Sequence, residues 1–191
     1  MKKLLPSLLL SSSLLLALEP TNSFYISAGL GSHITSELDA KVGTFTYDIP
    51  YEGFINLGYQ MKNFRFEIEQ IYSKSDLYSL GSISASGDFT RSSQMLNFYY
   101  SAYNTTNLVL NLGVGTGVSS TKLSNMRQNG VVVPDIKESN SASYQGLLSV
   151  GYYFTSHLST MIKYRYLYIS DGDMLEANGV NSLLVGLRVD F

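Results

Sequence analysis

The chain has 191 residues, a length that fits a single domain, and only 15% of them are charged. It contains no Cys, which excludes a disulfide scaffold, a thiolate metal site and a cysteine nucleophile. The formal net charge of −2 offers no basic surplus of the kind that binds nucleic acid, so no nucleic-acid partner is expected.

The N-terminal segment has the pattern of a secretory signal peptide. Lys2 and Lys3 precede an apolar, serine-rich run at 4–18, which is shorter than the ~20 apolar residues that a membrane-spanning helix needs. We therefore expect residues 1–23 to be a signal peptide, without a clean cleavage motif, and residues 24–191 to form the mature domain. A retained N-terminal anchor helix is the alternative. No later apolar run approaches spanning length, so a membrane location would require a closed barrel.

Eight short runs downstream alternate between apolar and polar residues, as strands do when their two faces differ. In one of them Ile162 and Tyr164 share a face, whereas Lys163 and Arg165 share the other. Such a pattern is unusual in a soluble sheet, but a transmembrane barrel strand needs it between lipid and a polar lumen. The expected strands are residues 24–31, 51–61, 64–72, 94–102, 108–118, 144–154, 158–168 and 183–191.

The connections between these strands alternate in length. Lys62 and Asn63 form a two-residue hairpin, and the residues that would pair across it, Met61 and Phe64, are both apolar, as residues on one face should be. Short periplasmic turns and long outer loops are the outer-membrane arrangement. The predicted fold class is therefore all-β, an eight-stranded antiparallel up-and-down transmembrane β-barrel. Its expected long outer loops are residues 32–50, 73–93, 119–143 and 169–181.

The inward faces of the expected strands carry charges of both signs. Eight strands enclose an interior just wide enough for side chains, so no wide pore is expected. An unpaired buried charge is costly, which predicts salt bridges between acids of the second and third strands and bases of the seventh and eighth. A gated conduction path is the alternative. The predicted lumen charge network is Glu52, Arg65, Glu67, Glu69, Lys163, Arg165, Arg188 and Asp190.

Small and aromatic residues complete this picture of a barrel. Gly113, Gly115 and Gly117 lie on one inward face and predict space for bulky lumen residues opposite. Aromatic residues near the strand ends are expected to form two girdles at the membrane interfaces, with Tyr replacing the absent Trp. A tyrosine-rich soluble core is the alternative. The expected girdle residues are Phe24, Tyr51, Tyr59, Tyr100, Tyr152, Phe154, Tyr164 and Tyr168.

Several short motifs occur in an order and spacing that resemble a known family. They are Tyr25–Gly31, Leu96-Asn97-Phe98-Tyr99-Tyr100, Leu112-Gly113-Val114-Gly115-Thr116-Gly117, Gly151-Tyr152-Tyr153-Phe154, Lys163-Tyr164-Arg165-Tyr166 and the terminal Phe191. Together they resemble the eight-stranded OmpA/opacity-type, porin-like superfamily of outer-membrane barrels, which includes bacterial surface antigens. The resemblance covers the whole mature chain and implies a location in the bacterial cell outer membrane, in contact with its lipid.

The last residues of the chain resemble the terminal signal by which such barrels are recognised for insertion. Gly186, Val189 and Phe191 match that signal, whereas Leu184 stands where a polar residue is usual. The resemblance implies the barrel-assembly machinery as a partner. The same terminal strand is expected to pair with the first strand and close the barrel.

Two loop constellations offer alternatives to a passive barrel. His33, Ser75 and Asp76 at the expected outer rim suggest acyl chemistry on a lipid, because lipid A palmitoyltransferases are barrels with such residues in these loops. The chain lacks the amphipathic helix that precedes the first strand in those enzymes. A second set of acids in the last loop offers a possible Ca²⁺ site, although solvated acids are the simpler interpretation. These acids are Asp171, Asp173 and Glu176.

The predicted function is that of a non-enzymatic surface protein, structural or similar to adhesins and surface antigens. Its four exposed loops would contact a host or environmental surface ligand, since loops on rigid scaffolds usually carry contacts. No cofactor or metal is expected, and the chain is expected to act as a monomer. A small porin-like passive channel is the first alternative, and a lipid A-modifying enzyme is the second.

Overall fold

The computed structural model describes residues 22–34, 37–40, 43–80, 83–128, 131–132, 134–173 and 175–191. The expected signal peptide, 1–23, lies outside these residues except for Asn22 and Ser23, which begin the first strand. None of the described residues belongs to a helix long and apolar enough to cross a membrane. Because most of the expected signal peptide lies outside the described residues, its cleavage stays a prediction.

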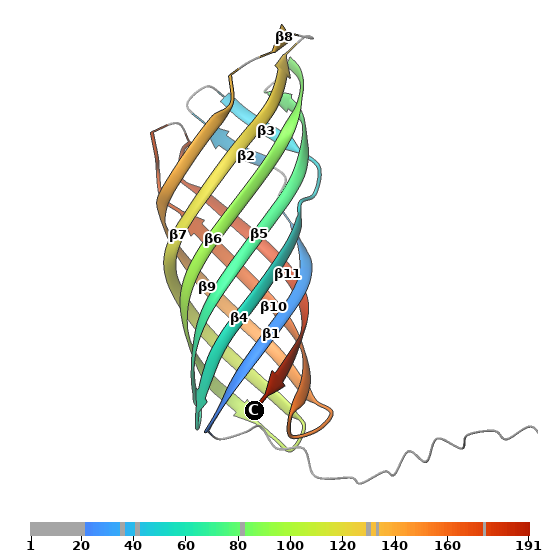
Figure 1. Cartoon of the computed structure of the whole chain (residues 1–191), viewed down its shortest axis with the longest axis vertical. Helices are drawn as coiled ribbons and strands as arrows, with labels where there is room; N and C mark the ends of the chain where they lie inside the picture. Colours follow the sequence, from blue (N-terminus) through green and yellow to red (C-terminus); the bar gives the residue numbers. More distant parts are fainter. Residues whose placement is uncertain are drawn as a thin grey trace, which may run out of the picture.

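Eight long antiparallel strands close into a barrel (Figure 1). The wall follows the order β5-β4-β1-β11-β10-β9-β7-β6, and β6 pairs with β5 to close it. Three short strands stand outside this wall: β2 and β3 form a hairpin that pairs with β5, and β8 pairs with β7. The strands are β1 (Asn22–His33), β2 (Glu37–Ala40), β3 (Gly43–Tyr47), β4 (Tyr51–Met61), β5 (Phe64–Leu80), β6 (Ile83–Asn104), β7 (Leu108–Gln128), β8 (Val131–Val132), β9 (Ile136–Tyr153), β10 (Leu158–Ile169) and β11 (Asn178–Asp190).

The register of the wall fixes its tilt. Following cross-strand partners from Leu158 on β10 through β11, β1, β4, β5, β6, β7 and β9 leads back to β10 at Tyr168, ten residues further along. A shift of this size over eight strands corresponds to a strand tilt of about 40°. The short hairpin at Lys62 and Asn63 pairs Met61 with Phe64, which confirms the predicted register.

The terminal strand closes the barrel, as predicted. Tyr25 on β1 is opposite Asp190 on β11, and the backbone N–H of Phe191 donates to the carbonyl oxygen of Phe24 at 2.9 Å. The C-terminus therefore lies at the same end as the short turns, at the bottom of Figure 1. The short turns of an outer-membrane barrel face the periplasm, so this end is assigned to the periplasm and the opposite end to the outside.

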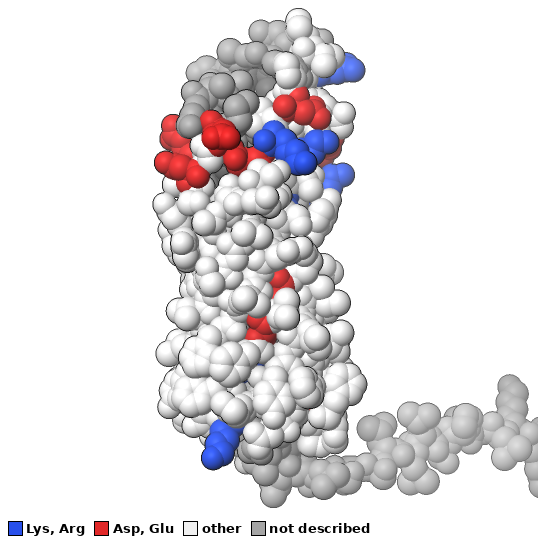
Figure 2. Space-filling view, turned by 60° about the vertical axis from the view of Figure 1, so that its left-hand side comes forward, with Lys and Arg blue, Asp and Glu red and all other residues white. Residues whose placement is uncertain are grey.

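An uncharged belt surrounds the barrel between its two ends. The described side chains that point outward over this zone are mostly Leu, Ile, Val, Phe and Tyr, and none of them is charged. Figure 2 shows the same division: charged side chains gather near the outer end, and the middle is almost entirely uncharged apart from two small acidic patches. An apolar outer wall around a closed barrel is the surface that a lipid bilayer requires.

Tyrosines mark the two borders of this belt. On both β4 and β9 an outward-facing pair lies eight residues apart, Tyr51 with Tyr59 and Tyr144 with Tyr152. Eight residues cover about 26 Å of strand and about 20 Å along the barrel axis at this tilt. That spacing is close to the apolar height of about 25 Å typical of such barrels. Tyr164, expected in a girdle, instead faces the middle of the belt, four residues below Tyr168 on β10.

The prediction of four long outer loops was wrong for much of their length. Residues 73–80 and 83–93 continue β5 and β6, and most of 119–143 continues β7 and β9. The alternation persists outside the belt but inverts: the apolar residues Leu77, Phe89 and Leu123 point inward there and are at most 4% exposed. Polar residues face outward there because water surrounds the strands in place of lipid. A search for strands with apolar outer faces therefore takes this sequence for a loop.

Candidate functional site

The centre of the interior is organised around Glu69 of β5. Its Oε1 accepts from Lys163 Nζ at 3.1 Å and from Arg165 Nη2 at 2.5 Å. Its Oε2 accepts from the side-chain amides of Asn97 at 2.9 Å and Gln145 at 3.0 Å. Both oxygens of this fully buried carboxylate are thus satisfied by two cations and two amides. The arrangement meets the condition under which a buried charge is tolerated.

Arg165 joins this centre to a second carboxylate, Glu52 of β4. The guanidinium forms an ion pair with Glu52 Oε1, and Glu52 Oε2 contacts His33 Nε2 at 2.8 Å. The hydroxyls of Ser182 and Ser73 also donate to Glu52 Oε2, at 3.2 and 3.3 Å. Side chains from four other strands therefore converge on this carboxylate, which links opposite sides of the wall across the lumen.

Two arginines and three tyrosines fill the periplasmic end. Arg65 lies over the rings of Tyr25 and Tyr99, with its guanidinium carbon 5.7 and 4.2 Å from their centroids. Arg188 lies over Tyr25 and Tyr153 at 3.8 and 5.9 Å. The result is a stack of alternating rings and guanidinium groups across the barrel mouth, in which cation–π attraction operates away from water.

Acids close the ion pairs at this periplasmic end. Arg188 donates to Asp190 Oδ1 at 2.5 Å, which is a partner on its own strand and not the predicted partner on β4 or β5. Arg65 lies 3.5 Å from Glu67, also on its own strand, and the Tyr25 hydroxyl donates to Glu67 at 2.7 Å. Together with the central cluster, the interior contains four acids and four bases from the predicted set, each at most 4% exposed. Any role of this set beyond filling the lumen stays a prediction.

Apolar layers lie between and above the charged clusters. Phe54, Met161 and Leu184 form one layer, which explains why an apolar residue occupies position 184 where a polar one was expected. A second layer lies further toward the outside and consists of Ile71, Met95, Leu167, Ile169 and Val180. Sequence reasoning missed both layers because it looked for polar residues inside. Extending the inward alternation from Arg165 to Leu167 and Ile169 would have found the second layer.

The glycines of β7 make room for this filling. A Cβ on Gly113 would lie 2.5 Å from the ring of Tyr99, and a Cβ on Gly117 would lie 2.7 Å from the sulfur of Met95. A Cβ on Gly115 would meet the side-chain oxygen of Asn97 at 2.1 Å. The prediction that these glycines admit bulky lumen residues is confirmed.

The predicted rim residues His33, Ser75 and Asp76 do not form a nucleophile and base. His33 ends β1, is 3% exposed and points inward, where its Nε2 contacts Glu52 and Ser73. The hydroxyl of Ser75 donates to the carbonyl oxygen of Asp48. The expectation of an outer-rim constellation was therefore wrong. The in–out alternation of β1 continues to its last residue, so the side chain of His33 points into the lumen.

Of the acids in the β10–β11 connection, Asp171 supports the local backbone. Asp171 accepts a hydrogen bond from the backbone N–H of Ala177, which closes this connection. Within the described part of the chain, no group of three or more His, Asp or Glu residues is placed to hold a metal ion.

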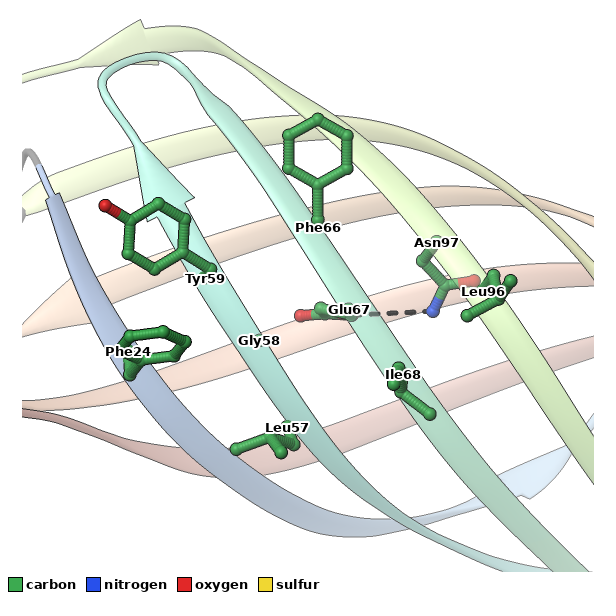
Figure 3. Close-up of a pocket in the computed structure, with 9 residues that line it drawn as sticks. All are labelled: Phe24, Leu57, Gly58, Tyr59, Phe66, Glu67, Ile68, Leu96 and Asn97. Carbon is green, nitrogen blue, oxygen red and sulfur yellow. Dashed lines mark hydrogen bonds between the residues drawn. The ribbon is translucent and has the colours of Figure 1, made fainter.

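The outer wall has a shallow groove of about 380 Å³ between β1, β4, β5 and β6 (Figure 3). Phe24, Leu57 and Tyr59 form one side of the groove, and Phe66 and Ile68 lie on the other. Glu67 and Asn97, which hydrogen bond at 3.4 Å, lie behind it on the inward side of the wall. An apolar groove on a lipid-facing wall suits an acyl chain and offers no group for catalysis.

Comparisons with known proteins agree with this architecture. The sequence matches no protein-family model, and no curated protein matches it. The chain is similar to Neisserial surface protein A, with a TM-score of 0.65 and 21% identity over 88% of this chain and 97% of that one. It is also similar to Ail, the attachment invasion locus protein of Yersinia pestis, with a TM-score of 0.54 and 15% identity over 90% of this chain and 100% of that one.

A third similar structure is the outer membrane protein OprG from Pseudomonas aeruginosa, with a TM-score of 0.52 and 15% identity over 92% of this chain and 98% of that one. At these identities the likeness concerns the fold. The chain therefore has the fold of the eight-stranded bacterial outer-membrane β-barrels, consistent with the OmpA/opacity-type resemblance of its sequence, and its closed wall and apolar belt make it an outer-membrane protein.

Proposed function

We propose that the protein is a non-enzymatic surface barrel whose extracellular sheet contacts another cell or an environmental surface. The observation that carries this proposal is the continuation of four neighbouring strands beyond the apolar belt. β5, β6, β7 and β9 remain hydrogen-bonded there and enclose the apolar residues Leu77, Phe89, Leu123 and Ile136. A packed sheet presents a rigid surface, which limits the entropy lost on binding.

The names of the similar structures support this proposal. One is called a surface protein, and Ail is called an attachment invasion locus protein. Ail has also been solved with the heparin analogue sucrose octasulfate. By analogy of fold, we infer that this chain acts at the cell surface as a monomer and turns over no substrate.

An adhesion experiment tests the proposal. The segment 120–140 is replaced by Asn-Gly, which joins the cross-strand partners Ser119 and Ser141 by a tight turn. Bacteria of a non-adherent strain that carry this variant should lose binding to host cells, whereas cells with the full chain bind. The control replaces Lys62 and Asn63 with the same Asn-Gly turn at the periplasmic end. Both variants must show the folded gel mobility, and equal adhesion by the shortened variant would contradict the proposal.

The filled interior argues against the alternative of a passive channel. Two ion-pair clusters, a stack of rings and guanidinium groups and two apolar layers occupy successive levels of the lumen. We expect the purified barrel to show no steady conductance in planar bilayers. Large, regular conductance steps from the purified barrel would favour the channel over the filled barrel.

The C-terminal residues are proposed to direct assembly. Val189 and Phe191 face outward, and Phe191 is 75% exposed, so its side chain contributes little to packing. We expect Phe191→Ala to slow insertion by the assembly machinery in cells but to leave refolding in detergent unchanged. A matched change at the other exposed end, Tyr51→Ala, should slow neither process.

A further inference from the structure

A row of lysines crosses the outer face of the extracellular sheet. Cross-strand pairing places Lys74 of β5 opposite Thr90 of β6, Thr90 opposite Lys122 of β7, and Lys122 opposite Lys137 of β9. Lys122 and Lys137 are like charges at directly opposed positions, an arrangement that destabilises a sheet unless an anion compensates it. Among the described residues, neither Lys74 nor Lys137 forms an ion pair.

The row begins at the border of the membrane. Lys74 lies two residues beyond Tyr72 and directly opposite Tyr51, both exposed tyrosines of the outer girdle. Its ammonium group is therefore at the level of lipid headgroups. Asp76 and Asp88 are opposite one another two residues further out, so an anion approaching along β5 from the bilayer meets Lys74 before it meets Asp76.

Below the lysines, the lipid-facing wall carries polar side chains that a bilayer would not otherwise favour. Gln70 of β5 is directly opposite Gln94 of β6, and both point outward within the belt. Gln70 donates to the hydroxyl of Ser92 at 3.0 Å and to the carbonyl oxygen of Ile71 at 3.0 Å. Gln94 is exposed, and an amide that faces hydrocarbon is costly unless it finds a hydrogen-bond partner.

A groove continues the same site toward the membrane centre. It has a volume of about 480 Å³ and is lined by Gln70 and Tyr72 together with the apolar side chains of Leu30 and Ile55. Gly53 forms part of its floor. Lysines, amides and an apolar groove thus follow one another along the axis, in the order in which phosphate, acyl linkage and acyl chain follow one another in a phosphorylated lipid.

We propose that this face binds a phosphorylated glycolipid of the outer leaflet. The phosphate lies over Thr90 between Lys74 and Lys122, which are two strand spacings, about 10 Å, apart. Lys122 exchanges its exposed contact with Asp135, 3.6 Å away, for the lipid phosphate. The amides of Gln70 and Gln94 bind the linkage carbonyls, and one acyl chain occupies the groove.

The glutamines favour a lipid over a sulfated glycan of another cell. A soluble polyanion would contact the lysines but could not reach Gln70 and Gln94 inside the belt. The two partners therefore predict different variants to be sensitive. The proposal uses only the orientation of the barrel in its membrane, so it stands or falls independently of the proposed adhesion.

Native mass spectrometry of the full barrel, refolded in detergent, tests the site with bisphosphorylated lipid A and with its dephosphorylated form. The double variant Lys74→Gln, Lys122→Gln should weaken binding of the bisphosphorylated form roughly 30-fold, the effect of removing two cations near an anionic surface. The double variant Gln70→Leu, Gln94→Leu should weaken binding of both forms. The control Lys62→Gln removes an exposed lysine of the periplasmic turn and should change neither.

Each variant must show the folded gel mobility before binding is compared. Unchanged binding by the lysine variant, or equal binding of the two lipid A forms, overturns the proposal. Inorganic phosphate alone should not displace the lipid at millimolar concentration; displacement would reduce the site to a general anion site. Tight binding of heparin with no selective binding of lipid A would assign the lysines to a glycan and also overturn it.

Discussion

The membrane half and the extracellular half of β5 follow opposite rules within one continuous strand. In the membrane, Ile68 faces out and Glu69 faces in; beyond the girdle, Asp76 faces out and Leu77 faces in. The hydrogen-bonded pairing with β6 continues through the change. The surrounding solvent therefore selects which residues face outward, whereas the barrel wall only fixes which residues share a face.

The interiors of the two halves are inverted in the same way. Inside the belt, charged and amide side chains pair with one another alongside apolar layers; outside it, Phe89, Leu123 and Met126 fill most of the space between the strands, and the buried Arg91 lies over the ring of Phe89. A polar interior depends on complete pairing, because each group that loses its partner remains buried. An apolar interior depends on volume, because each lost group leaves a cavity. Substitutions in the two halves should therefore differ in mechanism and in magnitude.

The largest expected effect comes from breaking the polar interior. Glu69→Leu leaves Lys163 and Arg165 buried without their shared carboxylate, and it leaves two amides without an acceptor. The free energy of unfolding should fall by about 3–5 kcal/mol. Urea titration of the barrel in detergent, followed by gel mobility and circular dichroism, measures the loss. The isosteric Glu69→Gln should also destabilise it, since it removes the charge but keeps the volume; equal stability of both variants with the parent would refute the importance of the pairing.

The extracellular half should lose stability locally. Phe89 is 0% exposed, and Phe89→Ala removes a large aromatic side chain from that interior. The sheet above the belt should become about 3 kcal/mol less stable. Limited proteolysis should then cut β6 and β7 outside the girdle, while the membrane half keeps its folded gel mobility. Loss of folded mobility would mean that the two halves unfold as one unit.

The strand plan of the membrane half could be predicted from the sequence because lipid imposes a clear pattern. The strand 51–61 was predicted with the bounds it has, and the hairpin at Lys62 gave its register. The extension of β5 to Leu80 could not be predicted from oily outer faces, since Lys74 and Asp76 there meet water. Polar and apolar residues still alternate in that segment. When it is not known whether lipid or water surrounds the segment, this alternation does not distinguish a strand with polar residues outside from a loop.

The interior was predictable in composition but not in pairing. Alternation directs Arg65, Arg188 and their acidic neighbours inward, but strand parity gives no information on which acid each base reaches. Arg188 reaches Asp190 on its own strand because residues two apart on a strand lie on the same face. The sequence did not predict the buried position of His33. The residues from there to Pro50 resemble a loop, so the first strand was expected to end two residues before His33.

A smaller effect than those of Glu69→Leu and Phe89→Ala is expected where a glycine of the barrel wall contacts a large side chain in the lumen. Gly113→Ala places a Cβ 2.5 Å from the ring of Tyr99, whereas Gly146→Ala places one where nothing lies within 4 Å. The first change should cost about 1–3 kcal/mol through overpacking. The second should be neutral or slightly stabilising, because it only restricts the unfolded chain. Urea midpoints of the two variants provide the measurement, and Tyr99→Leu should rescue the first variant if the ring is the cause.

The smallest effect is expected where the outer half meets water. Lys122 and Asp135 are about half exposed, and their charged groups are 3.6 Å apart. Such a pair contributes between about 0 and 0.5 kcal/mol, so Lys122→Gln should leave the urea midpoint within error of the parent. Removing this lysine also relieves its repulsion from Lys137, which offsets part of the lost attraction. A drop as large as that of Glu69→Leu would show that the outer sheet depends on charge pairing as the lumen does, and the contrast between the two halves would then fail.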